Sequence, residues 1–370
     1  MFCTSSVKQA MTEYITRSRD RLDLTNATAR LERVLQDIAR SVQISSDLTI
    51  SHPEYDSLVL PAELQERFAQ LPFQVQHDYL RVKLQQFLED IYYLPEPTAV
   101  KAKVDENQTI EWSKSQFLRQ LSKNNHGKGY FKSGWKIVGE TESGLLQVCK
   151  DGLTLHVMRD RHLSDTERLA KIGDVVRVKL PPQLVEPGYY IAVGDAGSID
   201  DLELPKHEPT VDLYLNLNSQ GALALMHGFT TELNTIAIPF HFKVLYRSED
   251  YIYSDTATLS FTKTDCDRLQ GIIQSLYQKH RDYFQSETPL FSKYLAPGLS
   301  IAERPPIDLS LAQHRFGIIA EALIYAWQHD KVSFAERLEC ISDRFRRENV
   351  SLKFPYCDRD SEDIYTPILF

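Results

Sequence analysis

The sequence lacks several features that define major classes of protein. No apolar run approaches the roughly 20 residues that a membrane-spanning helix needs, and the first residues lack the apolar core of a secretory signal. The five cysteines are scattered and include no CxxC pair, so they fit reduced thiols better than a disulfide framework or a zinc site. We therefore expect a cytoplasmic protein without membrane contact.

The chain also has no excess of basic residues. Its formal net charge is −9, whereas a general nucleic-acid binder would be basic, so we expect no nucleic-acid partner. Neither the P-loop spacing nor the Rossmann glycine fingerprint is present, and no cluster of metal ligands is visible, so no cofactor and no metal are expected. The 370 residues, 42% of them hydrophobic, are enough for two or three globular domains.

Composition and periodicity divide the chain into three parts and predict an α+β protein. Residues 1–110 have helical spacing of apolar residues, with Pro72 breaking or bending the run. Short strands with Gly, Asp and Pro turns predict a small antiparallel, barrel-like β block at 124–200. Residues 208–370 are predicted to form an α+β domain with two layers, and its polar-then-apolar tail is expected to dock back.

The clearest pattern lies in 211–262. Apolar and polar residues alternate strictly at its start, as in a strand with one buried face. A helix follows, and either Asn218 or Ser219 can cap it. The order of elements places helices on one face of an antiparallel sheet and leaves the other face free to line a cleft. The expected strand, helix and two further strands are 211–217, 219–234, 238–247 and 256–262.

The free face carries the candidate functional residues. The period of two places His241, Lys243 and Arg247 on one face of the second strand, beside a first strand with Tyr214 and Asn216 on its polar face. Three cationic or titratable groups on one face are typical of an anion site. A solvated sheet face carries the same residue types, so that alternative stays open.

Two loops add basic residues. Lys128 lies in NNHGKGYFKSGW, whose glycines are candidates for a backbone nest that binds phosphate, although such turns are usually only turns. Residues 287–308 are predicted to be a long irregular loop containing Lys293, and a loop of this length often forms the wall of a site. Arg315 follows in the first turns of a helix predicted at 309–329.

Several stretches in this order resemble the HopA-type type III effector family, and together they span roughly 124–328. They are HGKGYFKSGW, GLTLHVMRDRHL, GYYIAVGD, YLNLNSQGALALMHGFTTELNTIAIPFHFKVL, PLFSKYLAPGLSIAERP and QHRFGIIAEAL. The family contains plant-pathogen effectors. It also contains lyases of class V lanthipeptide and thioamidated-peptide pathways, which eliminate phosphate from phosphoserine or phosphothreonine in a precursor peptide that a separate kinase has phosphorylated.

The resemblance implies a phosphate β-elimination, which needs a base, a proton donor and cationic groups around the phosphate. A lysine can be the base where its neighbours favour the neutral amine, and guanidinium and ammonium groups bind phosphate strongly. Under this hypothesis the base is Lys243, the acid is His241, the phosphate ligands are Arg247, Lys293 and Arg315, and the substrate contacts are Tyr214, Asn216 and Lys128.

A second class of function remains, a non-catalytic peptide-binding module of the same family. Each candidate has a structural alternative: Lys243 as a solvated strand lysine, Lys293 as a tie for its loop, and Arg315 as the partner of Glu321 or another carboxylate. Cationic groups that converge in one cleft would favour the lyase, and cationic groups that point outward would favour the binding module.

Overall fold

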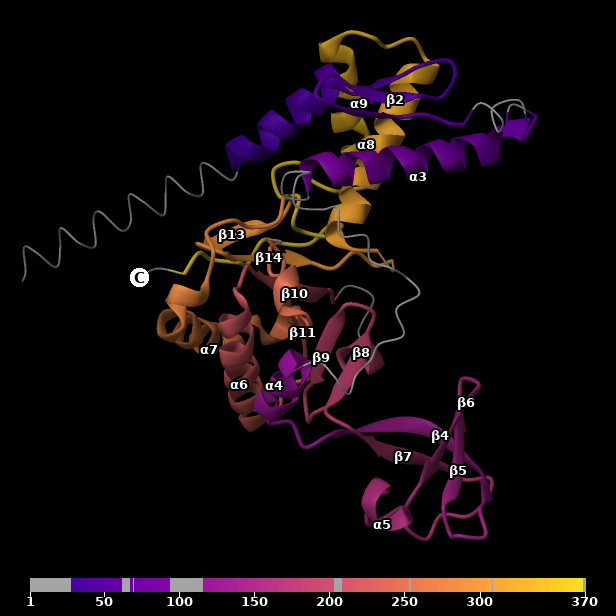
Figure 1. The fold of residues 1–370 in the computed structure, drawn as a ribbon, viewed down its shortest axis with the longest axis vertical. Coiled ribbons are helices and arrows are strands. Elements are labelled where there is room, and N and C mark those ends of the chain that lie inside the picture. Colours follow the sequence, from indigo (N-terminus) through magenta and orange to yellow (C-terminus); the bar gives the residue numbers. More distant parts are fainter. Residues whose placement is uncertain are drawn as a thin grey trace, which may run out of the picture. The chain divides into compact units, whose positions relative to one another are not determined.

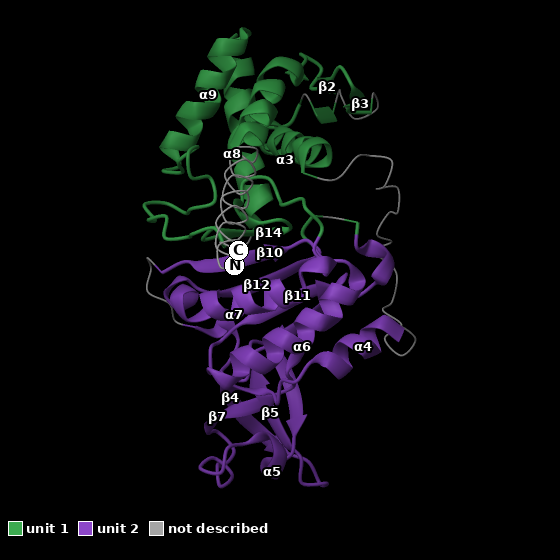
Figure 2. Cartoon of the chain, turned by 90° about the vertical axis from the view of Figure 1, so that its left-hand side faces the viewer, with its two compact units in different colours: residues 1–105, 252–255, 285–370 green, residues 106–251, 256–284 purple. Residues whose placement is uncertain are grey.

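The computed structural model describes residues 28–61, 67–68, 70–93, 116–202, 208–252, 254–307 and 309–368. The chain divides into two compact units (Figure 2). Unit 1 comprises residues 1–105, 252–255 and 285–370, and unit 2 comprises residues 106–251 and 256–284. Both contain helices and antiparallel strands, which confirms the α+β class (Figure 1).

The main sheet of unit 2 has the predicted two-layer form. Its strands run in the order β10-β12-β11-β9-β8, and each neighbouring pair is antiparallel. Helices α6 and α7 pack together beside the sheet (Figure 2), and the Phe229 ring of α6 lies 5.0 Å from the Phe242 ring of β11. The bounds are β8 Gln183–Glu186, β9 Tyr189–Val193, β10 Thr210–Leu215, α6 Ser219–Thr235, β11 His241–Leu245, β12 Ala257–Thr262 and α7 Cys266–Lys279.

A local hydrogen bond decides where α6 begins. Asn218 is its N-cap, and the side-chain oxygen of Asn218 accepts the backbone N–H of Gly221 at 2.9 Å. Farther along, Gly228 lets α6 approach α7 closely, because a Cβ at this position would lie 2.7 Å from a methyl carbon of Leu276. Asn218 thus determines where α6 begins, and Gly228 determines how closely α6 approaches α7.

A smaller sheet precedes the main one in unit 2. Its strand order is β6-β5-β4-β7, all antiparallel, around a core that includes Trp135, Ile137 and Val148. The predicted β block at 124–200 is therefore too long, because β8 and β9 belong to the main sheet. The bounds are α4 Gln116–Asn124, β4 Tyr130–Glu140, β5 Leu146–Lys150, β6 Leu153–Val157, α5 Arg159–His162 and β7 Val175–Leu180.

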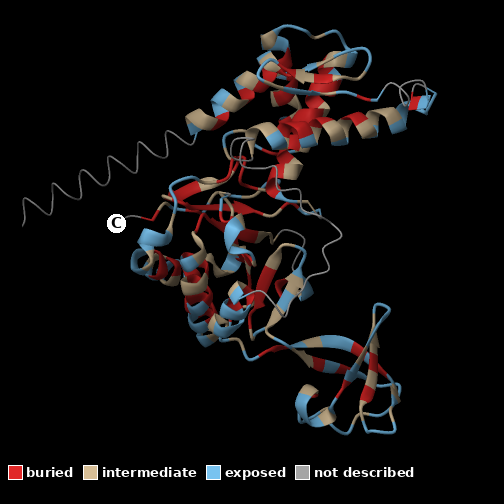
Figure 3. Cartoon of the chain, viewed as in Figure 1, coloured by how far each residue is buried: buried red, intermediate tan, exposed pale blue. Residues whose placement is uncertain are grey.

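Unit 1 is built on helices. Helix α8 packs against both α3 and α9, and most of its side chains are buried (Figure 3). Pro72 occupies the N-cap of α3, so the proline ends the preceding segment, as its chemistry predicts. The bounds are a helix at 28–41, α3 Phe73–Tyr92, α8 Leu311–Gln328 and α9 Phe334–Arg347.

Two expectations for unit 1 were wrong. The N-terminal region is not wholly helical, because β1 Gln43–Ile44, β2 Ile50–His52 and β3 Tyr55–Leu58 form a small antiparallel sheet. The segment 287–308 is not wholly irregular, because β13 Lys293–Ala296 and β14 Leu299–Glu303 form a hairpin. The parts of the predicted helical region at 1–27 and 94–110 lie outside the described residues.

Short 3₁₀ turns complete the structure, at Ile199–Asp201, Ser248–Asp250, Lys263–Asp265 and Arg281–Tyr283. The part of the chain that the structure describes contains no helix long and apolar enough to span a membrane.

Candidate functional site

The face of the main sheet away from Phe242 carries rows of polar residues. Cross-strand pairing joins Asp212 of β10 to Ser260 of β12, and Ser260 to His241 of β11. The next row joins Tyr214 to Thr258, and Thr258 to Lys243. In each row the side chains lie on the same face. The structure therefore brings Tyr214, His241 and Lys243 to one face, as the period of two predicts.

His241 is buried at this face and has two polar neighbours. Its Nε2 atom is hydrogen-bonded to the Ser198 hydroxyl at 2.9 Å, and its Nδ1 atom lies 3.7 Å from a carboxylate oxygen of Asp200. Its side chain is only 8% exposed. Both partners lie at the 3₁₀ turn after β9, so this turn fixes the imidazole at one end of β11.

Lys243 is more accessible and is held by β8 and β9. Its Nζ atom donates to a Glu186 carboxylate oxygen at 2.9 Å and lies 4.1 Å from the centre of the Tyr189 ring. The side chain of Lys243 is 36% exposed. The ammonium is therefore held between a carboxylate and the face of an aromatic ring, and the side chain is still partly open to solvent. Sequence analysis did not predict Glu186 or Tyr189 as neighbours, because neither lies near Lys243 along the chain.

Arg247 follows the end of β11 and is paired locally. Its Nε atom donates to Glu249 at 3.0 Å and lies 3.7 Å from Asp250. The hydrogen bond with Glu249, together with the charge of Asp250, raises the pKa of Arg247 above its usual value. The guanidinium is therefore a fixed positive charge that already has two carboxylate neighbours.

The remaining candidates of unit 2 have other surroundings. Tyr214 and Asn216 are buried, in β10 and just after it. Lys128 is exposed, and its backbone N–H donates to the Asp195 carboxylate at 2.6 Å. The neighbouring N–H of Gly127 donates to the side chain of Asn125. Acceptors from the chain itself thus occupy the backbone N–H groups of Gly127, one of the glycines predicted to form a phosphate nest, and of Lys128.

Lys293 and Arg315 belong to unit 1, where both hold the C-terminal segment. Lys293 Nζ donates to both carboxylate oxygens of Asp363, at 2.8 and 2.6 Å. Arg315 is fully buried and donates to the carbonyls of Pro355 and Cys357, each at 2.8 Å. In this structure the two cations stabilise the tail, which docks back as expected. Glu321, the alternative partner of Arg315, lies 3.6 Å from Arg81.

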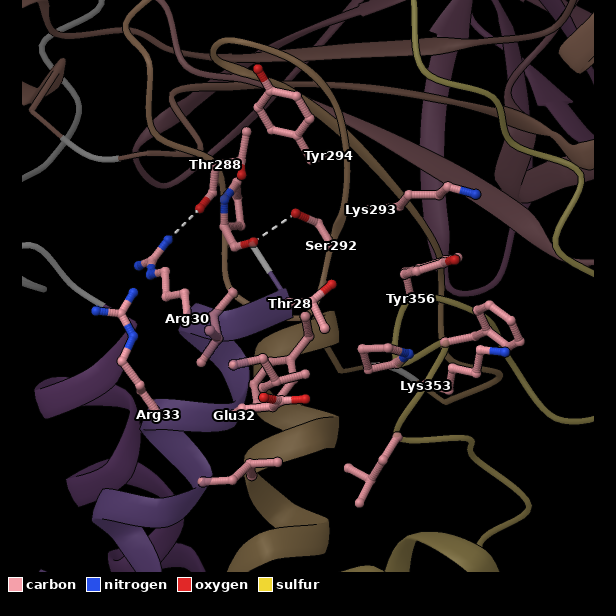
Figure 4. A pocket seen from close by; sticks show the side chains of 18 of the residues that line it. Thr28, Arg30, Glu32, Arg33, Thr288, Ser292, Lys293, Tyr294, Lys353 and Tyr356 are labelled. Carbon is pink, nitrogen blue, oxygen red and sulfur yellow. Dashed lines mark hydrogen bonds between the residues drawn. The ribbon is translucent and has the colours of Figure 1, made fainter. Parts of the chain in front are cut away.

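Lys293 also lines a cavity of about 940 Å³ in unit 1 (Figure 4). Helix 28–41 forms one wall, the residues before β13 form a second, and the segment 352–356 forms a third. Tyr356 lies beneath the Lys293 ammonium, 5.2 Å from it, and donates to Asp363 at 2.8 Å. Burial of the ring, together with this hydrogen bond, raises the pKa of Tyr356. Further cations at this cavity, none of them predicted, are Arg30, Arg33 and Lys353.

The candidate residues therefore fall into two environments. In unit 2, His241, Lys243 and Tyr214 share one sheet face, whereas Lys293 in unit 1 shares a cavity with residues that sequence reasoning missed. A second cavity of unit 1, about 190 Å³, includes Glu321. Within the described residues, no three His, Cys, Asp or Glu side chains form a group that could hold a metal ion.

Comparison with known proteins places part of the chain in a family. Residues 180–357 match the model of the HopA1 effector protein family. This segment begins at the end of β7 and includes β11, β13 and Arg315. No curated protein matches the chain.

Two solved structures are similar over most of their length. One is an effector protein from Pseudomonas syringae pv. tomato strain DC3000, with 17% identity, a TM-score of 0.39, and coverage of 80% of this chain and 95% of that chain. The other is an effector protein from Pseudomonas syringae pv. syringae strain 61, with 14% identity, a TM-score of 0.40 and the same coverage. The family assignment rests on the matched segment.

Proposed function

Through residues 180–357 this chain belongs to the HopA1 effector protein family, and we propose that it is a lyase that eliminates phosphate from phosphoserine or phosphothreonine in a peptide. The product is a dehydro amino acid, and the substrate is a precursor peptide phosphorylated by a separate kinase. The observation that carries the proposal is the placement of Lys243 and His241 on one face of β11, in rows with Tyr214 and Asp212 of β10.

The chemistry needs few protein groups. The neutral amine of Lys243 takes the proton from Cα of the phosphorylated residue. The electrons of that C–H bond form the Cα=Cβ double bond, and the Cβ–O bond breaks to release phosphate. The departing phosphate takes one proton from His241, which is reprotonated by the proton that Lys243 removed, so atoms and charges balance. His241, two residues along the same face, stays a prediction for the proton donor.

Burial of Lys243 beneath the substrate is the proposed route to the neutral amine. In this structure the ammonium of Lys243 donates to Glu186 at 2.9 Å. A peptide that covers this partly exposed side chain removes water from it, and desolvation favours the neutral form of both partners. The ammonium then releases its proton to bulk water, which leaves the base ready. Tyr189, beneath the amine, keeps it in place.

One observation favours the alternative, a non-catalytic peptide-binding module. Two of the three cations expected to bind phosphate have a carboxylate partner in this structure, Glu249 beside Arg247 and Asp363 beside Lys293, and the third, Arg315, is buried and donates to backbone carbonyls. A phosphate would have to displace these partners or bind beside them. A binding module needs no free cation and no base, and it would use the same sheet face only for recognition.

The test is elimination by the purified protein. A phosphothreonine peptide incubated with the wild-type chain is expected to lose the mass of phosphoric acid and then to form a thiol adduct, which a simple phosphatase product cannot do. Lys243→Ala should reduce the rate about a hundredfold or more, because a general base is lost. The matched control is Lys136→Ala, a lysine of the smaller sheet that is exposed and lies outside the site.

A negative result is resolved by adding the missing components. The assay is repeated with a phosphorylated precursor peptide and its kinase, which supply any flanking sequence that the short peptide lacks. A peptide that stays intact under both conditions, yet binds the chain, would replace the lyase with the binding module. Equal rates for wild type and Lys243→Ala would remove Lys243 as the base.

A further inference from the structure

Two arginines of one helix stand at the wall of the large cavity in unit 1. Arg30 and Arg33 are three residues apart on helix 28–41, so they are neighbours on its surface, with Cβ atoms about 5–6 Å apart. Both line the cavity of about 940 Å³. Figure 4 shows both side chains on the side of the cavity where Thr288 lies.

Their hydrogen-bond partners are backbone carbonyls. Arg30 Nη1 donates to the Thr288 carbonyl at 2.9 Å, and Arg33 Nε donates to the Ala29 carbonyl at 3.2 Å. Among the described residues neither guanidinium forms an ion pair with a carboxylate. Lys293 of the same cavity differs, because Asp363 neutralises it. Two adjacent cations without a carboxylate repel each other, so an anion that bridges them is attracted by both.

Three carboxylates line the cavity, those of Glu32, Glu287 and Asp363, and among the described residues none of them forms an ion pair with Arg30 or Arg33. Glu32 lies next to Arg33 in the sequence, and adjacent residues of a helix do not face each other. Asp363 is engaged by Lys293 and Tyr356. A further ammonium, that of Lys353, lies on the opposite wall, 5.1 Å from the centre of the Phe354 ring.

The rest of the lining is largely apolar. Leucine, phenylalanine and proline side chains line all three walls, and they include Leu31, Leu35, Pro289, Leu290, Phe291 and Phe354. The volume is at the upper end of the roughly 300–1,000 Å³ typical of ligand pockets. A ligand that fills this space must therefore combine an anionic group with apolar surface.

We infer that the cavity binds an apolar peptide segment that carries a phosphate monoester, with the phosphate between Arg30 and Arg33. A phosphate monoester carries nearly two negative charges, which match two guanidinium groups, whereas a carboxylate carries one. Each guanidinium can donate two parallel hydrogen bonds to phosphate oxygens. The inference goes beyond the proposed lyase activity, because it concerns binding at a second site on a helix outside the family-matched segment.

Binding is measured separately from elimination. The probe is a fluorescent peptide of apolar residues around one phosphonate analogue of phosphoserine, from which phosphate cannot leave. Fluorescence anisotropy follows its binding to the full chain and to Arg30→Gln/Arg33→Gln. The double variant is expected to bind about tenfold more weakly or worse, because both charge-assisted contacts are lost. Added salt should weaken wild-type binding.

Three controls decide the outcome. Arg40→Gln changes an arginine of the same helix that lies over the Phe334 ring and outside the cavity, so affinity should stay within about twofold. Arg30→Lys/Arg33→Lys keeps the charge and should restore part of the affinity. Circular dichroism and thermal unfolding establish that each variant is folded.

Two results would overturn the inference. One is equal affinity of wild type and Arg30→Gln/Arg33→Gln for the phosphonate peptide. The other is equal affinity of the wild type for the phosphonate peptide and its unmodified serine counterpart. Inorganic phosphate that binds as tightly as the peptide would remove the role of the apolar walls. None of these results affects the elimination assay, so failure here is distinguishable from failure of the lyase proposal.

Discussion

At the scale of single residues, Lys243 and His241 share one face of β11 but have different surroundings. Lys243 is about one-third exposed, whereas His241 is nearly buried. The difference comes from Ser198 and Asp200, which the chain brings to His241 from the turn after β9. Glu186 reaches Lys243 only through the pairing of β8, β9 and β11. Strand periodicity contains no information on which neighbours cover a face.

Substitution of Glu186 distinguishes two roles for Lys243, general base and charged ligand of the phosphate. In Glu186→Gln the ammonium loses its carboxylate neighbour, so a larger fraction of the amine is neutral at a given pH. If Lys243 is the base, the rising limb of the pH–rate profile moves to lower pH and the rate near neutrality increases. The measurement is the elimination rate from about pH 5 to about pH 9.

The matched control for this pH–rate profile is Glu249→Gln, which likewise removes a carboxylate partner of a cation, in this case Arg247. Glu249→Gln should not move the rising limb of the pH–rate profile, because Arg247 stays charged throughout this pH range. A Glu186→Gln profile that coincides with wild type would contradict the role of Lys243 as base. A profile that falls at every pH would instead indicate that the charged ammonium is needed to bind phosphate.

At the scale of elements, the sequence patterns predicted the strands and helix of 211–262 but not the short strands of unit 1. The strands and helix of 211–262 were predicted because alternation and capping residues are local signals. The hairpin of β13 and β14 was missed, although Pro297 and Gly298 separate the strands and Gly298 has φ 70°. Proline followed by glycine is the signature of a type II turn, so a signal was present. The short strands β1–β3 were also missed, although Pro53 lies in the turn between β2 and β3.

The start of α6 gives a test at this scale. The sequence allowed either Asn218 or Ser219 as the cap, and the structure selects Asn218, whose side chain accepts from Gly221. Asn218→Ala should lower the free energy of unfolding by about 1 kcal/mol, because the backbone donor at the helix start loses its acceptor. The measurement is denaturant unfolding followed by circular dichroism.

Ser219→Ala is the control for this prediction. It removes a hydroxyl from the adjacent position without removing the cap, and alanine favours a helix, so stability should change by less than about 0.5 kcal/mol. An equal loss in both variants would contradict the assignment of the cap. Because α6 covers the face of β11 opposite Lys243, its position also fixes the strand beneath it.

At the scale of the whole molecule, buried charges organise contacts that sequence analysis could not specify. Glu303 is 1% exposed and accepts hydrogen bonds from the Asp358 backbone, Ser361 and Tyr365. Together with Lys293 and Arg315 it holds the C-terminal segment. Sequence analysis predicted that the tail docks back but interpreted Lys293 and Arg315 as phosphate ligands. A basic residue type does not reveal whether its partner is a ligand or a distant part of the chain.

The same region makes stability depend on pH through His314. Burial, with the charges of Arg315 and Arg359, lowers the pKa of His314 to about 4. An unfolded histidine has a pKa near 6.5, so between about pH 6.5 and pH 4 the unfolded state binds more protons than the folded state. The stabilisation is complete above this window and is lost as the pH falls through it. The loss should reach roughly 2 kcal/mol near pH 4.5.

His314→Gln isolates this contribution, because glutamine keeps a polar side chain but does not titrate. We expect the variant to lose less stability than wild type between about pH 7 and about pH 4.5, measured by denaturant unfolding at each pH. His329→Gln, at the C-terminal end of the same helix, should keep the wild-type slope, because His329 is exposed. A His314→Gln slope equal to that of wild type would place the acid sensitivity in the carboxylates. The neutral imidazole beside Arg315 would then have no measurable part in holding the C-terminal segment.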